Sequence, residues 1–156
     1  MASKPRVLIV DDSRPVVTLL KVVLEREGYE VVTAYNGDDG LRLAREQKPD
    51  LIVLDIIMPG MDGYEVCYRL RQDYLTADIP ILMLTGKGNV DEEPGWKKDF
   101  AMRLRERLKG FDAGATGFMS KPVSVKRFLR EVEALLWFGG RARSPLTSRE
   151  GRRRNG

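Results

Sequence analysis

Residues 7–13 read VLIVDDS and residues 51–55 read LIVLD, and these two stretches decide the fold. Each is a run of four apolar residues that ends in aspartate. Continuous apolar runs, in place of alternating ones, are typical of strands buried on both faces of a parallel sheet. Further apolar runs lie at residues 31–32, 81–84 and 118–119. The sequence therefore predicts five buried strands.

Helix-length amphipathic stretches separate these strands. Apolar residues at helical spacing predict four helices. The first follows Ser13, the second stops before Pro49, the third covers residues 64–70 and the fourth covers residues 125–136. Gly139-Gly140 lies beyond the end of the fourth. Repeated strand–helix units predict a doubly wound α/β domain. The expected architecture is a five-stranded parallel sheet with strand order 2-1-3-4-5.

Composition excludes several classes of chemistry. The chain has 156 residues, which is about one domain, with no histidine and a single cysteine, Cys67. Histidine-based catalytic sites, histidine metal ligands, multi-cysteine zinc sites and an intrachain disulfide are therefore excluded. No apolar run approaches the length of a membrane span, and the sequence favours a cytoplasmic protein without membrane contact. Carboxylates, hydroxyls, lysines and backbone groups are left for any chemistry.

The basic charge is concentrated at the end of the chain. The formal net charge is +4, and residues 139–156 hold six arginines against one glutamate. This segment has no periodic apolar face, so we expect residues 1–138 to form the domain and residues 139–156 to form a basic, disordered tail. The high pI is then no evidence that the fold binds nucleic acid, and at most the tail makes a weak, sequence-blind contact.

Polar residues follow four of the predicted strands. Asp11 and Asp12 follow the first, Asp55 follows the third, and Thr85 and Lys121 stand at the ends of the fourth and fifth. The carboxyl ends of parallel strands share one edge, so these side chains are expected to converge. Three carboxylates in one crevice favour Mg²⁺. With a lysine and a hydroxyl nearby, this set is suited to phosphoryl transfer onto an aspartate.

Four motifs resemble the receiver domains of two-component response regulators. They are VLIVDDS at 7–13, DLIVLDIIMPGMDG at 50–63, LTG at 84–86 and GATGFMSKP at 114–122. They occur in the order of that family, and the resemblance covers about residues 5–138. It implies a flavodoxin-like receiver fold and a Mg²⁺-dependent phosphoprotein.

The resemblance also implies a metal site. Asp12 is similar to the direct Mg²⁺ ligand, and Asp11 to the acid that acts through water. Asp55 resembles the phosphorylated aspartate, which also contacts the metal. The backbone carbonyl of Ile57 is implied as a further ligand.

Three other residues match the switch of this family. Thr85 resembles the switch hydroxyl and Lys121 the phosphate-binding lysine. Phe118 occupies the position of the switch aromatic, often tyrosine in the family, and is expected to turn inward on phosphorylation. The Lys121-Pro122 peptide is expected to be cis, although few X–Pro bonds are.

The implied function is a phosphorylation switch. A sensor histidine kinase or a histidine phosphotransfer protein would donate the phosphoryl group to Asp55. The chain would then change conformation and so control the binding of a downstream partner. It would catalyse only its own phosphorylation and dephosphorylation, so we do not expect a turnover enzyme.

Residues 86–111 depart from the family pattern. This connection is about a dozen residues longer than usual, with a loop at 86–95 and an expected basic helix at 96–111. The helix, together with the last helix, is expected to form a docking face for a downstream protein or a second copy of the chain. The alternative is a helix that packs its own apolar stripe, with Trp96 and Phe100, on the domain.

Three other functions compete with the simple switch. Residues 145–150, PLTSRE, resemble the opening of the DNA-binding domain of one family of two-component transcription factors, although only six residues follow. The chain would then be the N-terminal part of a DNA-binding regulator. A scaffold that never carries phosphate would usually lack an acid or the lysine, and neither is missing. An aspartate-dependent phosphatase or dehalogenase would need a cap domain, for which the length leaves no room.

Overall fold

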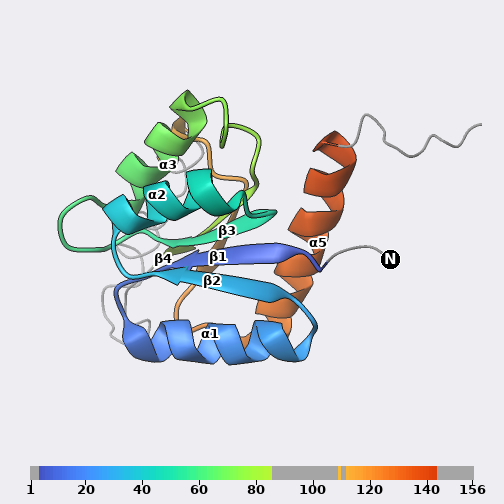
Figure 1. The fold of residues 1–156 in the computed structure, drawn as a ribbon. Coiled ribbons are helices and arrows are strands. Elements are labelled where there is room, and N and C mark those ends of the chain that lie inside the picture. The colour runs from blue at the N-terminus through green and yellow to red at the C-terminus, as the bar shows by residue number, and fades with distance from the viewer. Residues whose placement is uncertain (1–3, 86–108, 110–111, 144–156) are drawn as a thin grey trace, which may run out of the picture.

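The computed structural model describes residues 4–85, 109 and 112–143. Five parallel strands form one sheet in the order β2-β1-β3-β4-β5, which confirms the predicted order (Figure 1). The buried strands β3 and β4 lie at the centre of the sheet with β1, as their continuous apolar sequences predicted. The strands are β1 (Arg6–Val10), β2 (Glu30–Ala34), β3 (Leu51–Asp55), β4 (Ile81–Thr85) and β5 (Gly117–Ser120).

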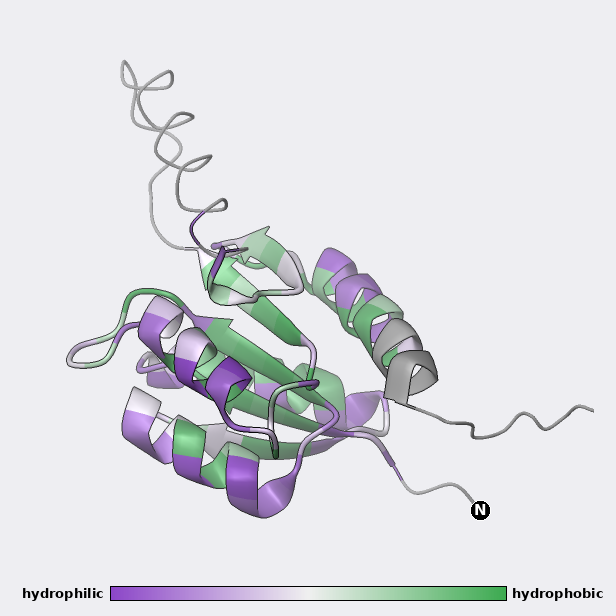
Figure 2. Cartoon of the chain, turned by 90° about the horizontal axis from the view of Figure 1, so that it is seen from above, coloured by the Kyte–Doolittle hydropathy of each residue, from purple (hydrophilic) through white to green (hydrophobic). Residues whose placement is uncertain are grey.

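Helices cover both faces of the sheet. The helices α1 (Arg14–Arg26) and α5 (Val125–Arg143) pack on one face, and α2 (Gly37–Gln47) and α3 (Gly63–Gln72) on the other (Figure 1). Alternate side chains of each strand enter opposite core clusters: Leu8 packs under α2 and α3, and Ile9 packs under α1 and α5. Figure 2 shows the result, with hydrophobic strands inside and mostly hydrophilic outer helix faces.

Side-chain caps start the helices at the carboxyl edge of the sheet. The Ser13 hydroxyl accepts a hydrogen bond from the Val16 backbone at 3.4 Å, and Asn36 and Asp62 cap α2 and α3 in the same way. Gly28, with φ +93°, ends the first helix as predicted. These short connections fix where each helix begins relative to the strand before it.

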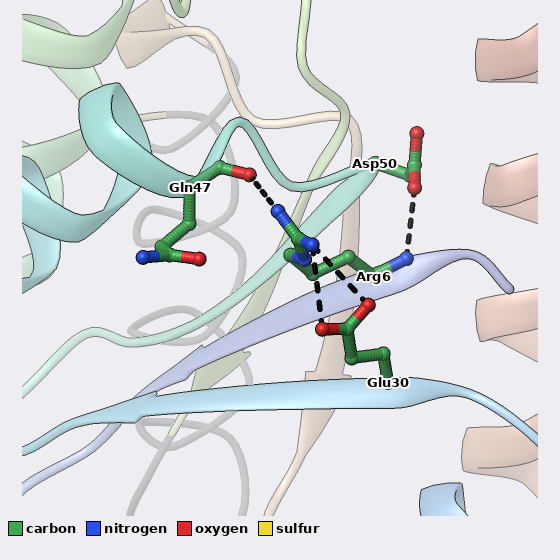
Figure 3. Close-up of polar contacts among 4 residues, drawn as sticks. All are labelled: Arg6, Glu30, Gln47 and Asp50. Atoms are coloured by element: carbon green, nitrogen blue, oxygen red, sulfur yellow. Dashed lines mark hydrogen bonds and ion pairs between the residues drawn. The ribbon is translucent and has the colours of Figure 1, made fainter. Parts of the chain in front are cut away.

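The amino edge of the sheet is held by Arg6. Its backbone N–H donates to the Asp50 carboxylate at 2.8 Å, and its guanidinium donates to the Gln47 carbonyl and the Glu30 carboxylate (Figure 3). These contacts join β1 to the start of β2 and to the residues before β3. They lie at the edge opposite the predicted site, so we assign them to stability.

A second arginine ties α3 to the entrances of β4 and β5. The Arg71 guanidinium donates to the carbonyls of Ala77, Ile79 and Gly114 at 3.0, 2.8 and 2.9 Å. These carbonyls precede the two strands, so one side chain satisfies backbone acceptors from two separate connections. Arg71 therefore fixes how β4 and β5 enter the sheet.

The last helix is longer than predicted. It continues through Gly139-Gly140 and ends at Arg143, so residues 139–143 are helical and the predicted tail boundary is wrong there. Glycine costs only about 1 kcal/mol relative to alanine in a helix, which is too little to stop a helix already fixed by packing. The helix ends two residues before Pro145, where the chain is sterically disfavoured from continuing.

Two predictions lie outside the described residues. They are the predicted loop at 86–95 and almost all of the predicted helix at 96–111. Residues 144–156 of the predicted tail also lie outside the described residues. Among the described residues, no helix is long and apolar enough to cross a membrane.

Candidate functional site

The sheet topology brings the predicted site residues to one edge. Asp11 and Asp12 directly follow β1, Asp55 ends β3, Thr85 ends β4 and Lys121 directly follows β5. The strands carrying the first three are hydrogen-bonded neighbours, in a register that aligns their carboxyl ends. The convergence expected from strand ends and strand order is confirmed.

Three carboxylates meet in a space the size of a metal site. One oxygen from each of Asp11, Asp12 and Asp55 lies within 4.8 Å of the others. Asp11 and Asp55 are buried, whereas Asp12 is exposed. Asp11 also makes a local contact: its Oδ1 accepts a hydrogen bond from the Ser13 backbone N–H at 2.9 Å, which fixes the turn into α1.

Lys121 supplies one positive charge to this cluster. Its Nζ lies 2.9 Å from Asp11 Oδ2 and 3.2 Å from Asp55 Oδ1. Burial alone would lower the pKa of the lysine, but the hydrogen bond to Asp11 and the charge of Asp55 outweigh burial, so the pKa is raised and the ammonium persists. One ammonium still leaves three carboxylates with excess negative charge.

This imbalance perturbs Asp55. Its pKa is raised from 3.8 to about 7: burial and the neighbouring Asp11 charge raise the pKa by more than the charge of Lys121 lowers it. A divalent cation would remove the repulsion, and Mg²⁺ prefers a few carboxylate oxygens plus water. The donor set, its spacing and its uncompensated charge all fit such an ion. Ile57 lies two residues after the end of β3, so its backbone carbonyl is part of the loop that follows Asp55. The Ile57 side chain is half-exposed.

The two predicted switch residues are already buried. Thr85 Oγ1 donates to the Met119 carbonyl on β5 at 3.4 Å. Phe118 is only 8% exposed and belongs to the core cluster under α2 and α3. An inward turn from an exposed position is therefore not available from this conformation. Its switch role stays a prediction.

Backbone contacts join β4 to the residues after β5. The Lys121 N–H donates to the Thr85 carbonyl at 2.9 Å, so the hydroxyl and the ammonium are attached to adjoining backbone. The Lys121-Pro122 peptide is cis, as the family resemblance implied.

One residue that supports the site, Gly63, carries no predicted role in the sequence. Gly63 starts α3, and its N–H donates to the Ile56 carbonyl at 2.7 Å. A Cβ at this position would lie 2.4 Å from the Asp55 carbonyl oxygen. The only sequence signal is the glycine at the end of the second quoted motif, because the contact itself depends on the angle at which α3 approaches β3.

The fold and the acidic edge together define a receiver domain. The model of the response regulator receiver domain family matches residues 7–95, and the chain belongs to that family. The DNA-binding dual master transcriptional regulator RpaA of Synechocystis is 42% identical over 132 residues, 85% of this chain and 49% of that protein. The alkaline phosphatase synthesis transcriptional regulatory protein PhoP of Bacillus subtilis is 44% identical over 131 residues, 84% of this chain and 48% of that protein.

Solved structures show the same architecture. The chemotaxis protein CheY4 of Vibrio cholerae is 30% identical, with a TM-score of 0.71, and the match covers 85% of this chain and 98% of that one. A CheY-like receiver domain protein of Methanospirillum hungatei gives a TM-score of 0.75 at 27% identity, covering 90% and 99%. The chain thus spans nearly all of these structures, but about half the length of the curated relatives.

Proposed function

We propose that this chain accepts a phosphoryl group on Asp55 from a partner's phosphohistidine, with Mg²⁺ bound at the acidic edge. One observation carries the proposal: a buried carboxylate at the end of the central strand β3 lies between a lysine and two further acids. A structural role alone does not account for it, since the arrangement raises the pKa of Asp55.

The chemistry needs no general base. An ionised Asp55 oxygen attacks phosphorus in line, the P–N bond to the donor imidazole breaks, and the leaving nitrogen retains the bonding electrons and is protonated. Mg²⁺ would be held by Asp12, Asp55 and the Ile57 carbonyl, with Asp11 acting through water, and would neutralise charge on the phosphoryl oxygens.

Lys121 and Thr85 complete the reaction site. The ammonium, already 3.2 Å from Asp55, would pair with a phosphoryl oxygen once the aspartate is esterified. The Thr85 hydroxyl would leave the Met119 carbonyl and donate to another phosphoryl oxygen. That exchange changes the contact between β4 and β5 and would favour the active conformation. The chain modifies only itself, so it is a switch and not a turnover enzyme.

The exposed face of α1 suits the phosphodonor partner. Leu19 and Val22 are each 46% exposed and lie one helical turn apart, on a helix that begins two residues after Asp12. This apolar pair, on the helix that starts at the acidic edge, would dock a sensor histidine kinase or a histidine phosphotransfer protein. On α5, the 60% exposed Trp137 is a candidate contact for a downstream protein or a second copy.

Intact-mass spectrometry tests the proposed reaction. The chain is incubated with acetyl phosphate in Mg²⁺ or in EDTA, alongside Asp55→Asn and the control Asp38→Asn, an exposed acid on α2. A Mg²⁺-dependent gain of one phosphoryl group in the wild type and the control, but not in Asp55→Asn, is expected. No gain in folded wild-type protein would favour the scaffold function.

A second proposal concerns output. Both curated relatives named above are transcriptional regulators, and this chain corresponds to about half of each. We infer that the switch serves transcriptional control in a longer DNA-binding regulator. Direct DNA contact by the basic tail is measured by duplex binding at moderate salt, with and without residues 141–156. Binding that survives removal of these residues would contradict contact by the tail.

A further inference from the structure

An arginine at the start of α1, at the same edge of the sheet as the acidic cluster, stacks on an aromatic ring. Arg14 is the first residue of α1, two residues after Asp12, and its guanidinium carbon lies 4.1 Å from the centroid of the Tyr35 ring. Tyr35 directly follows β2. The end of that strand is joined to the site by the hydrogen bond from the Asp11 N–H to the Ala34 carbonyl, 3.1 Å.

The Tyr35 ring is held by packing, and no carboxylate in the described part of the chain neutralises Arg14. Tyr35 is partly buried and packs against the core cluster under α1. Arginines on α2 and α3, such as Arg42, Arg45 and Arg69, each pair with a carboxylate. Among the described residues, no carboxylate forms an ion pair with the exposed Arg14. Stacking uses the face of the guanidinium, so the N–H donors at its edge remain for a ligand.

A positive charge near the acidic site would help an anionic phosphodonor to bind. A phosphodonor carries negative charge, and it must approach three carboxylates that a single lysine does not neutralise. A second cation at the rim would attract that donor and orient its oxygens. The planar guanidinium matches the oxygens of a phosphoryl group in a bidentate arrangement.

We propose that Arg14, oriented by Tyr35, binds the phosphoryl oxygens of the incoming donor before transfer to Asp55. This inference rests on the proposed function. Arg14 is a positioning residue, and the covalent step on Asp55 is unchanged. The phosphoryl group can come from a small acyl phosphate or from a phosphohistidine, and two small donors represent these sources: acetyl phosphate with its P–O bond and phosphoramidate with its P–N bond.

The test compares variants of the full chain by the rate of mass gain at subsaturating donor and saturating Mg²⁺. The variants are Arg14→Gln, Arg14→Lys and Tyr35→Leu, and the control is Arg26→Gln, an exposed arginine at the far end of the same helix. Arg14→Gln is expected to lower the rate with acetyl phosphate roughly fivefold at low salt. This loss of rate should be smaller in high salt, and smaller with phosphoramidate, which carries less net negative charge. Arg14→Lys keeps the positive charge, so it should keep most of the salt-dependent part of the wild-type rate.

Two results would overturn the inference. One is equal rates for Arg14→Gln and Arg26→Gln with both donors. The other is a loss of the same size for both donors that does not depend on salt, which would indicate a structural role. An effect confined to one donor supports the inference and identifies that bond type as the source.

A binding measurement keeps the inference separate from the reaction. Acetonylphosphonate, an inert analogue of acetyl phosphate, is titrated against the wild type and the same variants in Mg²⁺ and followed by NMR. Weaker binding by Arg14→Gln than by Arg26→Gln supports the role of Arg14 even if the wild type never gains phosphate, a result that would contradict only the proposed function. Equal binding by the two variants contradicts the role of Arg14.

Discussion

Asp55→Asn is expected to make the metal-free protein more stable at neutral and alkaline pH. The substitution removes one of three clustered negative charges but keeps the shape of the side chain and an oxygen that accepts from Lys121. In most sites the loss of a charged hydrogen-bond partner destabilises a protein. Here the sign is reversed because the charge is buried beside another carboxylate.

The pH dependence follows from the pKa of Asp55, which is raised from 3.8 to about 7. Between these values the folded chain retains a proton that the unfolded chain has released, so wild-type stability falls as the pH rises through this window and then levels off. At about 1.4 kcal/mol per pH unit, the full effect is about 4 kcal/mol at pH 8. Asp55→Asn does not lose this stability as the pH rises, and the stabilities of the two proteins should converge below about pH 4.

Mg²⁺ should narrow the difference in stability between Asp55→Asn and the wild type. An ion that binds the folded wild type stabilises it by about 2.7 kcal/mol at a concentration of 100 Kd. The same concentration should stabilise Asp55→Asn less, because one ligand charge is gone.

The assay is urea unfolding in EDTA and in Mg²⁺, at pH 5 and pH 8, for both proteins. Asp38→Asn, an exposed acid on α2, is the control and should change stability by less than about 0.5 kcal/mol. An Asp55→Asn protein that is no more stable than the wild type at pH 8 in EDTA would refute the reasoning. So would a stability gain of equal size at both pH values.

Side chains around the acidic edge and at the amino edge give further measurable effects. Gly63→Ala should lower stability by about 1–3 kcal/mol and impair phosphorylation, because the new Cβ meets the Asp55 carbonyl; wild-type urea unfolding and phosphorylation would contradict this. Arg71→Met should cost about 2–4 kcal/mol, since three buried or half-buried carbonyls lose their donor, and Arg71→Lys should recover only part; a loss below 1 kcal/mol in urea unfolding would refute it. Lys121→Met should raise the pKa of Asp55 further, measured by NMR of its carboxyl carbon, because the lysine lowers that pKa in the wild type; an unchanged or lower value would count against the charge argument.

The sequence was sufficient for the sheet and for the convergence of the acids. Three four-residue apolar runs and two shorter ones predict the strands. The aspartates that follow β1 and end β3 predict the acidic edge once these strands are neighbours. Both inferences use only local pattern and topology, and both are confirmed.

Contacts that depend on packing angles could not be predicted. The approach of Gly63 to the Asp55 backbone, the stacking of Arg14 on Tyr35 and the end of α5 each depend on tertiary packing. Local propensity placed the helix end at two glycines, whereas packing carried the helix past them. The buried position of Phe118 is likewise a choice among rotamers that the residue type leaves open.

The weak hydrogen bond of Thr85 bears on how often the unmodified protein adopts the alternative hydroxyl position. Its hydroxyl donates to the Met119 carbonyl at 3.4 Å, near the upper limit for a hydrogen bond. Exchanging that partner costs about 1 kcal/mol or less, which corresponds to populations within about a factor of ten. An unmodified molecule would therefore visit the alternative hydroxyl position often. A low resting output must then come from the rest of the β4–β5 contact, or from a partner that recognises more than this one hydroxyl.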